Sequence, residues 1–146
     1  MDAILFSARR GRVNVEDGRR FLEDPDHSEL YWDLPHKVTS RKFSFPILGL
    51  IHIKGGKVQY QATIAKIIPG DPSYYEDATL ISRTKPSEWQ RGSPNWRSWS
   101  TLVITKIEPF SIEAMSLKRY DGIPAKRAPQ GNYTRIIAPK PEDAGP

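Results

Sequence analysis

The sequence contains no cysteine, and only three histidines, His27, His36 and His52, are scattered along it. The absence of cysteine excludes disulfide bonds, thiolate metal ligands and a cysteine nucleophile. Too few histidines are present, and too far apart in sequence, to favour a histidine-rich metal site. No window approaches the run of about 20 apolar residues that a membrane-spanning helix needs. The N-terminus lacks the basic and apolar regions of a secretory signal, so we expect a cytoplasmic protein with no membrane contact.

Local signatures of catalysis are missing as well. The chain has no Gly-x-Ser-x-Gly elbow and no Ser-x-x-Lys supported by companion motifs. The Gly55-Gly56 pair lies between two predicted strands and not at a strand-to-helix junction, so it does not predict a nucleotide-binding loop. The carboxylate pairs Asp24/Asp26 and Glu142/Asp143 fall in segments of solvated composition. We therefore expect a binding domain with no cofactor, and not an enzyme.

The composition that is present indicates one globular domain. The chain has 146 residues, of which 38% are apolar and 27% charged. Its net charge of +5 and pI of about 9.5 favour a polyanionic partner, although a basic surface that only confers solubility fits the charge equally well. We assign residues 1–138 to the domain. The Pro-rich residues 139–146 are typical of a flexible tail or of the start of a linker, which suggests that further domains follow.

A β-hairpin is the clearest element that the pattern predicts. Apolar residues alternate on both sides of Lys54-Gly55-Gly56-Lys57, and two central glycines suit a tight hairpin turn. Counting outward from the turn predicts three facing pairs, Ile53 with Val58, Ile51 with Tyr60 and Ile47 with Ile64. The same count puts Leu50 on the opposite, mixed face, so the hairpin should have one apolar side.

Other segments carry weaker signals. Residues 3–6, 99–107 and 132–137 read as strands, with Glu108-Pro109-Phe110 ending the second of them. Residues 16–23 read as a short helix that ends before Pro25, residues 30–36 as a loop or strand end, and residues 70–97 as a long irregular stretch. Short strands with few helices and Pro/Gly-rich turns predict an α+β, mostly β fold, a small curled β-barrel with short peripheral helices.

Large aromatic residues are interleaved with basic residues along the chain. Flat rings can replace the stacking that an extruded nucleobase loses, and cations can hold the phosphates. The candidate base-binding rings are Trp32, Trp89, Trp96, Tyr74 and Tyr75. The candidate phosphate contacts are Lys37, Arg41, Lys42, Arg91, Arg97, Lys118, Arg119, Lys126 and Arg127. The alternative for each ring is a packing role in the core or in a loop, and the alternative for each cation is a solvated surface.

The order of these features resembles the PUA-like superfamily, in particular its EVE and YTH branches, which read modified nucleobases. The resemblance rests on Tyr31-Trp32-Asp33-Leu34-Pro35, the glycine-turn hairpin, the strand 100–107 that leads into Glu108-Pro109-Phe110, and Tyr120-Asp121-Gly122-Ile123-Pro124. These pieces span most of residues 3–138. Within the superfamily the chain is most similar to the N-terminal domains of archaeal McrB-like restriction ATPases, which recognise methylated DNA by flipping the base into an aromatic cage.

The resemblance implies roles for particular residues. Trp32 would form one wall of the cage, and Trp89, Trp96 or the Tyr74-Tyr75 pair would form the other. Asp33 would accept a hydrogen bond from the base edge, unless it caps the following turn. The implied partner is double-stranded DNA with a modified base, bound for a larger assembly that holds the ATPase and nuclease. An RNA-binding PUA-like domain and a small nucleotide-processing enzyme on the same barrel remain open as alternatives.

Overall fold

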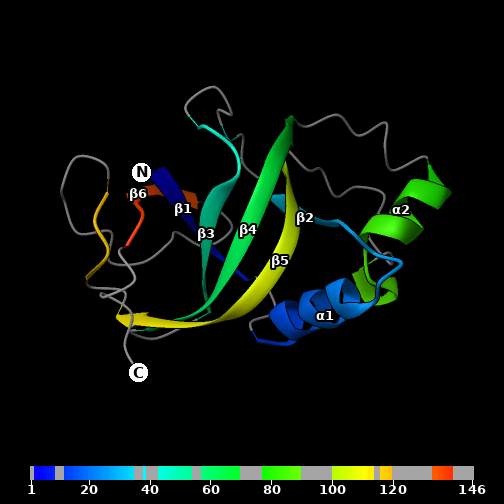
Figure 1. Ribbon diagram of the computed structural model, residues 1–146, viewed down its shortest axis with the longest axis horizontal. Coiled ribbons are helices and arrows are strands. Elements are labelled where there is room, and N and C mark those ends of the chain that lie inside the picture. Colours follow the sequence, from blue (N-terminus) through cyan, green and yellow to red (C-terminus); the bar gives the residue numbers. More distant parts are fainter. Residues whose placement is uncertain are drawn as a thin grey trace.

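The structure is a computed structural model that describes residues 2–8, 12–34, 38, 43–53, 57–69, 77–89, 100–113, 116–119 and 133–139. It is mostly β, as predicted (Figure 1). The strands are β1 (Asp2–Ser7), β2 (Leu30–Leu34), β3 (Ile47–His52), β4 (Lys57–Pro69), β5 (Ser100–Glu113) and β6 (Tyr133–Ile137). The helices are α1 (Arg12–Glu23), α2 (Ala78–Thr84) and the 3-10 helix η3 (Ser87–Trp89).

The six strands form one mixed sheet in the order β2-β5-β4-β3-β1-β6. Among the described strands only β1 and β3 pair in parallel, and the chain between them includes α1 and β2, as a parallel pair requires a long crossover. Within the described residues β2 and β6 are the two edges and do not pair with each other. The sheet is therefore open, and closure into the predicted barrel is not confirmed.

The sheet is nevertheless strongly curled. Three strands separate β1 from β2, so a flat sheet would hold them about 19 Å apart at the usual strand spacing. Instead, the ring centroids of Phe6 on β1 and Trp32 on β2 lie 5.4 Å apart. The long strands β4 and β5 arch across the molecule (Figure 1), and three register shifts in their pairing supply local bends. The curl brings the two ends of the sheet onto a common core.

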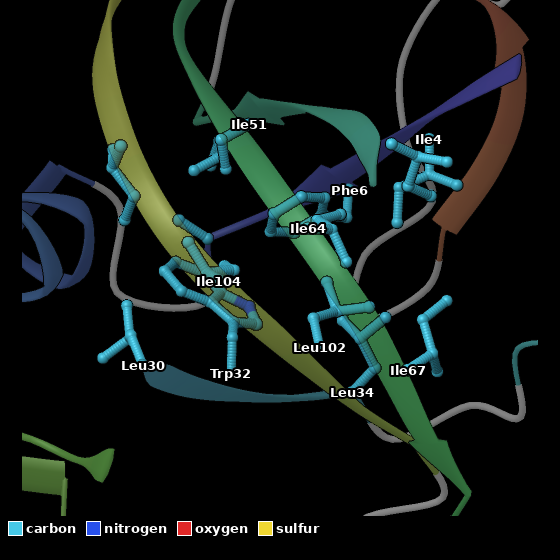
Figure 2. Packing of buried hydrophobic residues seen from close by; sticks show 14 of the residues in the cluster. Ile4, Phe6, Leu30, Trp32, Leu34, Ile51, Ile64, Ile67, Leu102 and Ile104 are labelled. Atoms are coloured by element: carbon cyan, nitrogen blue, oxygen red, sulfur yellow. The ribbon is translucent and has the colours of Figure 1, made fainter. Parts of the chain in front are cut away.

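Apolar side chains cover both faces of the central strands. The larger cluster fills the concave side of the curl (Figure 2), with Ile4, Phe6, Trp32, Ile51, Ile64 and Ile104 among its members. A smaller cluster lies on the other face and contains Ala3, Leu5, Leu50, Val58, Ile112, Leu117 and Ile136. Because side chains alternate along a strand, the unbroken apolar run of β1 supplies both clusters.

The predicted hairpin register is confirmed over most of its length. Ile47 pairs with Ile64 and Ile51 with Tyr60. The expected pair of Ile53 with Val58 is wrong, because the register shifts after Ile51 and His52 pairs with Val58 instead. The shift turns Val58 into the smaller cluster beside Leu50, so the face expected to be mixed is apolar here. The turn residues 54–56 lie outside the described residues.

Several predicted boundaries needed correction. Helix α1 ends at Glu23 as expected but begins at Arg12, four residues earlier than predicted. Residues 30–34 form a full strand, which pairs with β5. The stretch predicted to be irregular contains α2 and η3, and Asp77 caps α2 by accepting a hydrogen bond from the backbone N of Leu80 at 3.0 Å. An aspartate at a helix N-cap is a helix-start signal, and the prediction of an irregular stretch did not take Asp77 into account.

The predicted break at Pro109 is also wrong, because β5 continues to Glu113. Pro109 faces Tyr60 on β4, next to a register shift. On its other side β5 pairs with β2 only as far as Ile104 among the described strands. Proline lacks an N–H but is tolerated where a strand is paired on one side or bulged, which is the situation of Pro109. The final strand β6 agrees with its prediction to within one residue.

Gly49 on β3 offers a test of the core packing. A Cβ at this position would lie 2.8 Å from Cδ1 of Ile64 and 2.9 Å from Cε1 of Phe6, two fully buried side chains. We expect Gly49→Ala to lower the free energy of unfolding by about 1–3 kcal/mol, measured by urea denaturation. Val13→Ala, at a side chain that is 63% exposed on α1, is the control and should change it by less than about 0.5 kcal/mol. Equal midpoints for Gly49→Ala and the parent would contradict the packing described here.

Candidate functional site

Trp32, the first predicted cage wall, lies in the core on β2 with only 5% of its surface exposed. Its ring makes edge-to-face contacts with two of the described side chains. One is with Phe6, at an interplanar angle of 76°, and the other is with Trp89, at a centroid distance of 5.4 Å and an angle of 88°. Such perpendicular arrangements are favourable for aromatic pairs. Trp32 therefore packs as a core residue and also supports Trp89.

Trp89 is the last residue of η3 and is half-buried. Its Cη2 reaches α1, 3.5 Å from where a Cβ on Gly18 would lie. Its Nε1 is buried and has no hydrogen-bond acceptor among the described residues. An unsatisfied buried donor of this kind destabilises a structure by about 1–3 kcal/mol. Two of the five predicted rings are thus in contact, whereas Tyr74, Tyr75 and Trp96 lie outside the described residues.

Asp33 follows Trp32 on β2 and therefore points to the opposite face of the strand. Its carboxylate forms an ion pair with Nζ of Lys85, and both side chains are almost fully buried, at 5% and 7% exposure. Thr101, its partner across the β2–β5 pairing, donates its hydroxyl to Oδ1 of Asp33 at 2.7 Å. The group predicted to contact a base edge is thus engaged with a lysine and a threonine in this structure.

Sequence reasoning missed Lys85. It lies 52 positions from Asp33, just after the C-terminus of α2, in a stretch predicted to be irregular. A cation next to Asp33 can be found only from the tertiary structure, because no local pattern links residues so far apart. The signal that was available was the N-cap at Asp77, which places a short helix immediately before Lys85.

Only two of the predicted phosphate contacts fall within the described residues. Lys118 and Arg119 are exposed, and their backbone extends the pairing of β6, since N of Ile137 donates to O of Lys118 at 2.8 Å and Arg119 bridges to Ile136. They lie at the β6 edge of the sheet, whereas Trp32 lies on β2 at the other edge. The candidates outside the described residues are Lys37, Arg41, Lys42, Arg91, Arg97, Lys126 and Arg127.

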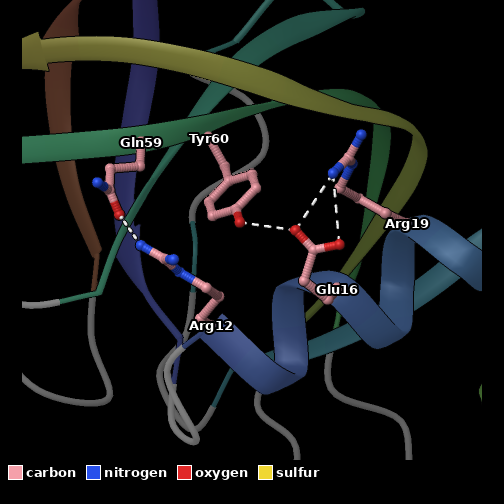
Figure 3. Close-up of polar contacts among 5 residues, drawn as sticks. All are labelled: Arg12, Glu16, Arg19, Gln59 and Tyr60. Atoms are coloured by element: carbon pink, nitrogen blue, oxygen red, sulfur yellow. Dashed lines mark hydrogen bonds and ion pairs between the residues drawn. The ribbon is translucent and has the colours of Figure 1, made fainter.

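A polar network that the sequence did not predict joins α1 to β4 (Figure 3). Oε1 of Glu16 accepts hydrogen bonds from the hydroxyl of Tyr60 at 2.7 Å and from Nη1 of Arg19 at 3.2 Å. Nη2 of Arg12 donates to Oε1 of Gln59 at 2.7 Å. These contacts hold the outer side of α1 against β4, while Gly18 on the same helix faces the core.

The network shifts two pKa values in opposite directions. The hydrogen bond from Tyr60 lowers the pKa of Glu16 below its ordinary value of 4.5, and Arg19 adds to this effect, whereas burial opposes it. Burial raises the pKa of Tyr60 above its ordinary value of 10.0, and its hydrogen bond to Glu16 adds to the rise. The folded state therefore favours an ionised Glu16 and a neutral Tyr60.

Two kinds of feature were not found in the part of the chain that the structure describes, a metal-binding cluster and a membrane-spanning helix. Within these residues no three His, Asp or Glu side chains are grouped so that they could hold a metal ion. None of the described helices is both long and apolar enough to cross a bilayer. Among the described residues, three features could take part in binding or chemistry: the contacting tryptophans, the buried ion pair and the α1–β4 network.

The lowered pKa of Glu16 predicts how stability depends on pH. Its stabilising effect should be complete above about pH 4.5 and should be lost as the pH falls through the lower pKa of the folded state. We expect Glu16→Gln to be less stable than the parent at neutral pH, with the difference shrinking as the solution is acidified. Tyr60→Phe removes the main cause of the pKa shift of Glu16. Its loss of stability relative to the parent should shrink with acidification in the same way. Urea denaturation across this pH range is the measurement, and a pH-independent difference would contradict the assignment.

Comparisons of the chain with protein-family models, with curated proteins and with solved structures find no match. The description of the fold and of the candidate site therefore depends on the geometry reported above. The similarity to PUA-like domains that the sequence indicated stays a prediction.

Proposed function

We propose that the chain is a PUA-like nucleic-acid-binding module that recognises a methylated base in double-stranded DNA by flipping it against Trp89 and Trp32. The observation that carries this proposal is the contact of the half-buried Trp89 with Trp32, together with the buried Nε1 of Trp89 that lacks an acceptor among the described residues. A flipped base has a flat face for an indole ring and edge atoms that can accept a hydrogen bond. The net charge of +5 favours the same kind of partner.

The exposure of the two rings argues for different roles. Trp89 is half-buried and lies on the one-turn helix η3, outside the sheet. Trp32 is nearly fully buried beneath Trp89, so it can offer a face to a base only when Trp89 moves. Asp33 is held by Lys85 and Thr101, and in the proposal it acts on the base edge only if one of these contacts is exchanged.

The proposal assigns no reaction to the chain itself. Following the resemblance to McrB-like proteins, ATP hydrolysis and DNA cleavage would belong to other domains or partner subunits of a restriction system in the cytoplasm. The role of this module would be to direct that machinery to modified DNA.

Binding to matched oligonucleotides tests the proposal. Fluorescence anisotropy at one salt concentration should give tighter binding to duplexes with methylated adenine or cytosine than to the unmodified duplex. Each stacked base contributes about 1–3 kcal/mol, so we expect Trp89→Ala to weaken binding to the methylated duplex by about tenfold or more. Trp89→Phe, which keeps an aromatic face but lacks Nε1, is the matched control and should lose less affinity than Trp89→Ala. Circular dichroism of both variants checks that they are folded.

Three outcomes would change the conclusion. Equal affinity for methylated and unmodified duplexes would exclude recognition of the modification. Tighter binding to RNA than to methylated DNA at equal salt would favour the RNA-binding alternative, since only RNA offers the 2′-hydroxyl. Unchanged binding by Trp89→Ala would remove Trp89 from the site. Trp32→Ala is a poor test, because loss of a buried tryptophan costs about 3–5 kcal/mol of stability.

A further inference from the structure

Residues 85–89, here named the edge strap, pass around the edge of β2 from one face of the strand to the other. Neighbouring residues of a strand point to opposite faces, so Trp32 and Asp33 mark the two faces of β2. Lys85 contacts Asp33 on one face, and Trp89 contacts Trp32 on the other. Since β2 ends the strand order, the edge that the strap crosses pairs with no other described strand.

One end of the edge strap is held by the buried ion pair. The side chains of Lys85 and Asp33 are 7% and 5% exposed, and the backbone N of Lys85 donates to O of Ile81 in α2 at 2.9 Å. Removal of one member of a buried ion pair leaves the other charge uncompensated, which is strongly unfavourable. Release of the strap would let water solvate the group that is left. Loss of either partner should therefore shift the strap from its docked position toward release.

The other end of the edge strap is held less well. Trp89 packs its ring against Trp32, but its Nε1 is buried without an acceptor among the described residues. Its backbone N donates to O of Pro86 at 2.9 Å, which closes the single turn of η3. Water would satisfy Nε1 in a released strap, so this donor favours release. The strap thus combines one strong polar contact with one destabilising feature, as expected of a segment that opens locally.

We propose that the edge strap is a lid, latched by Lys85 and Asp33, that must leave β2 before a base can reach Trp32. This inference rests on the proposed function, in which Trp32 and Trp89 form the base-binding surface. With the strap docked, Trp32 is 5% exposed and offers too little surface for stacking. Release carries Trp89 away from the edge of Trp32 and frees Nε1 to donate to a ligand.

A lid of this kind predicts how the affinity for a ligand depends on the strength of the latch. When only a small fraction of molecules is open, the apparent dissociation constant equals the intrinsic one divided by that fraction. A weaker latch therefore tightens binding in proportion to the open fraction. Lys85→Met should improve binding to a polyanion although it removes a positive charge, an outcome opposite to that expected for a lysine that contacts phosphate.

Hydrogen exchange of the Trp89 indole N–H measures the opening without any ligand. NMR on the whole chain would follow this proton, which is assigned by its loss in Trp89→Phe. In the parent we expect its protection factor to be at least about tenfold lower than those of the β4 amides that bond to β5. Equal protection would mean that Trp89 is released only by global unfolding, and it would overturn the lid even if no variant could be made.

The latch variant provides the second measurement. Lys85→Met should lower the protection of the Trp89 indole N–H by at least about tenfold and should tighten binding to the methylated duplex by up to the same factor. The charge-matched control is Lys106→Met, whose side chain is 65% exposed in an ion pair with Glu108. It should leave the protection unchanged and the binding unchanged or weaker.

The outcomes separate the lid from the proposed function. Unchanged protection in Lys85→Met would overturn the latch, and lower protection without tighter binding would overturn its role in admitting a base. If the parent binds none of the oligonucleotides, the proposed function fails. In that case the protection factors of the parent and of Lys85→Met still decide whether the strap is a latched lid.

Discussion

The curl of the sheet is the constraint on which the rest of the structure depends. Its direct measure is the distance of 5.4 Å between the ring centroids of Phe6 on β1 and Trp32 on β2, because three other strands separate β1 from β2 in the sheet. This contact lets one apolar cluster collect side chains from both ends of the sheet. Helix α1 then packs across it, with Gly18 so close to Leu30 that a Cβ would lie 2.8 Å from Cδ2. In a flat sheet, β2 would have no core to cover it.

The strand order leaves β2 as an edge of the sheet, and a segment distant in sequence contacts both of its faces. Exposed strand edges invite pairing with other chains, and proteins commonly cover them with loops or charges. Here the edge strap covers β2, with a polar contact at Asp33 and an aromatic contact at Trp32 on its two faces. If the strap is also the lid that we propose, protection of the edge and access to the tryptophans are controlled by the same five residues.

The sequence alone determined the elements whose patterns are local. Short segments of strand-like composition predicted β1 and β6. Alternating apolar residues around a short turn predicted the pairing of Ile51 with Tyr60, because a strand repeats every two residues and the turn sets the register. Pro25 predicted the end of α1, because its ring disfavours helical geometry in the residue before it. The mostly β fold class followed from these elements. The family resemblance implied Trp32 as one cage wall and left the other open between Trp89, Trp96 and the Tyr74-Tyr75 pair; Trp89 contacts Trp32, and the cage itself stays a prediction.

Only the tertiary structure decided how these elements pack against one another. The burial of Trp32, the ion pair between Asp33 and Lys85 and the passage of β5 through Pro109 all depend on neighbours that are distant in sequence. Periodicity describes which side of a strand is apolar, but it carries no information on which strand or loop will cover that side. The open, curled form of the sheet is likewise set by bulges and packing between strands, which no local pattern encodes.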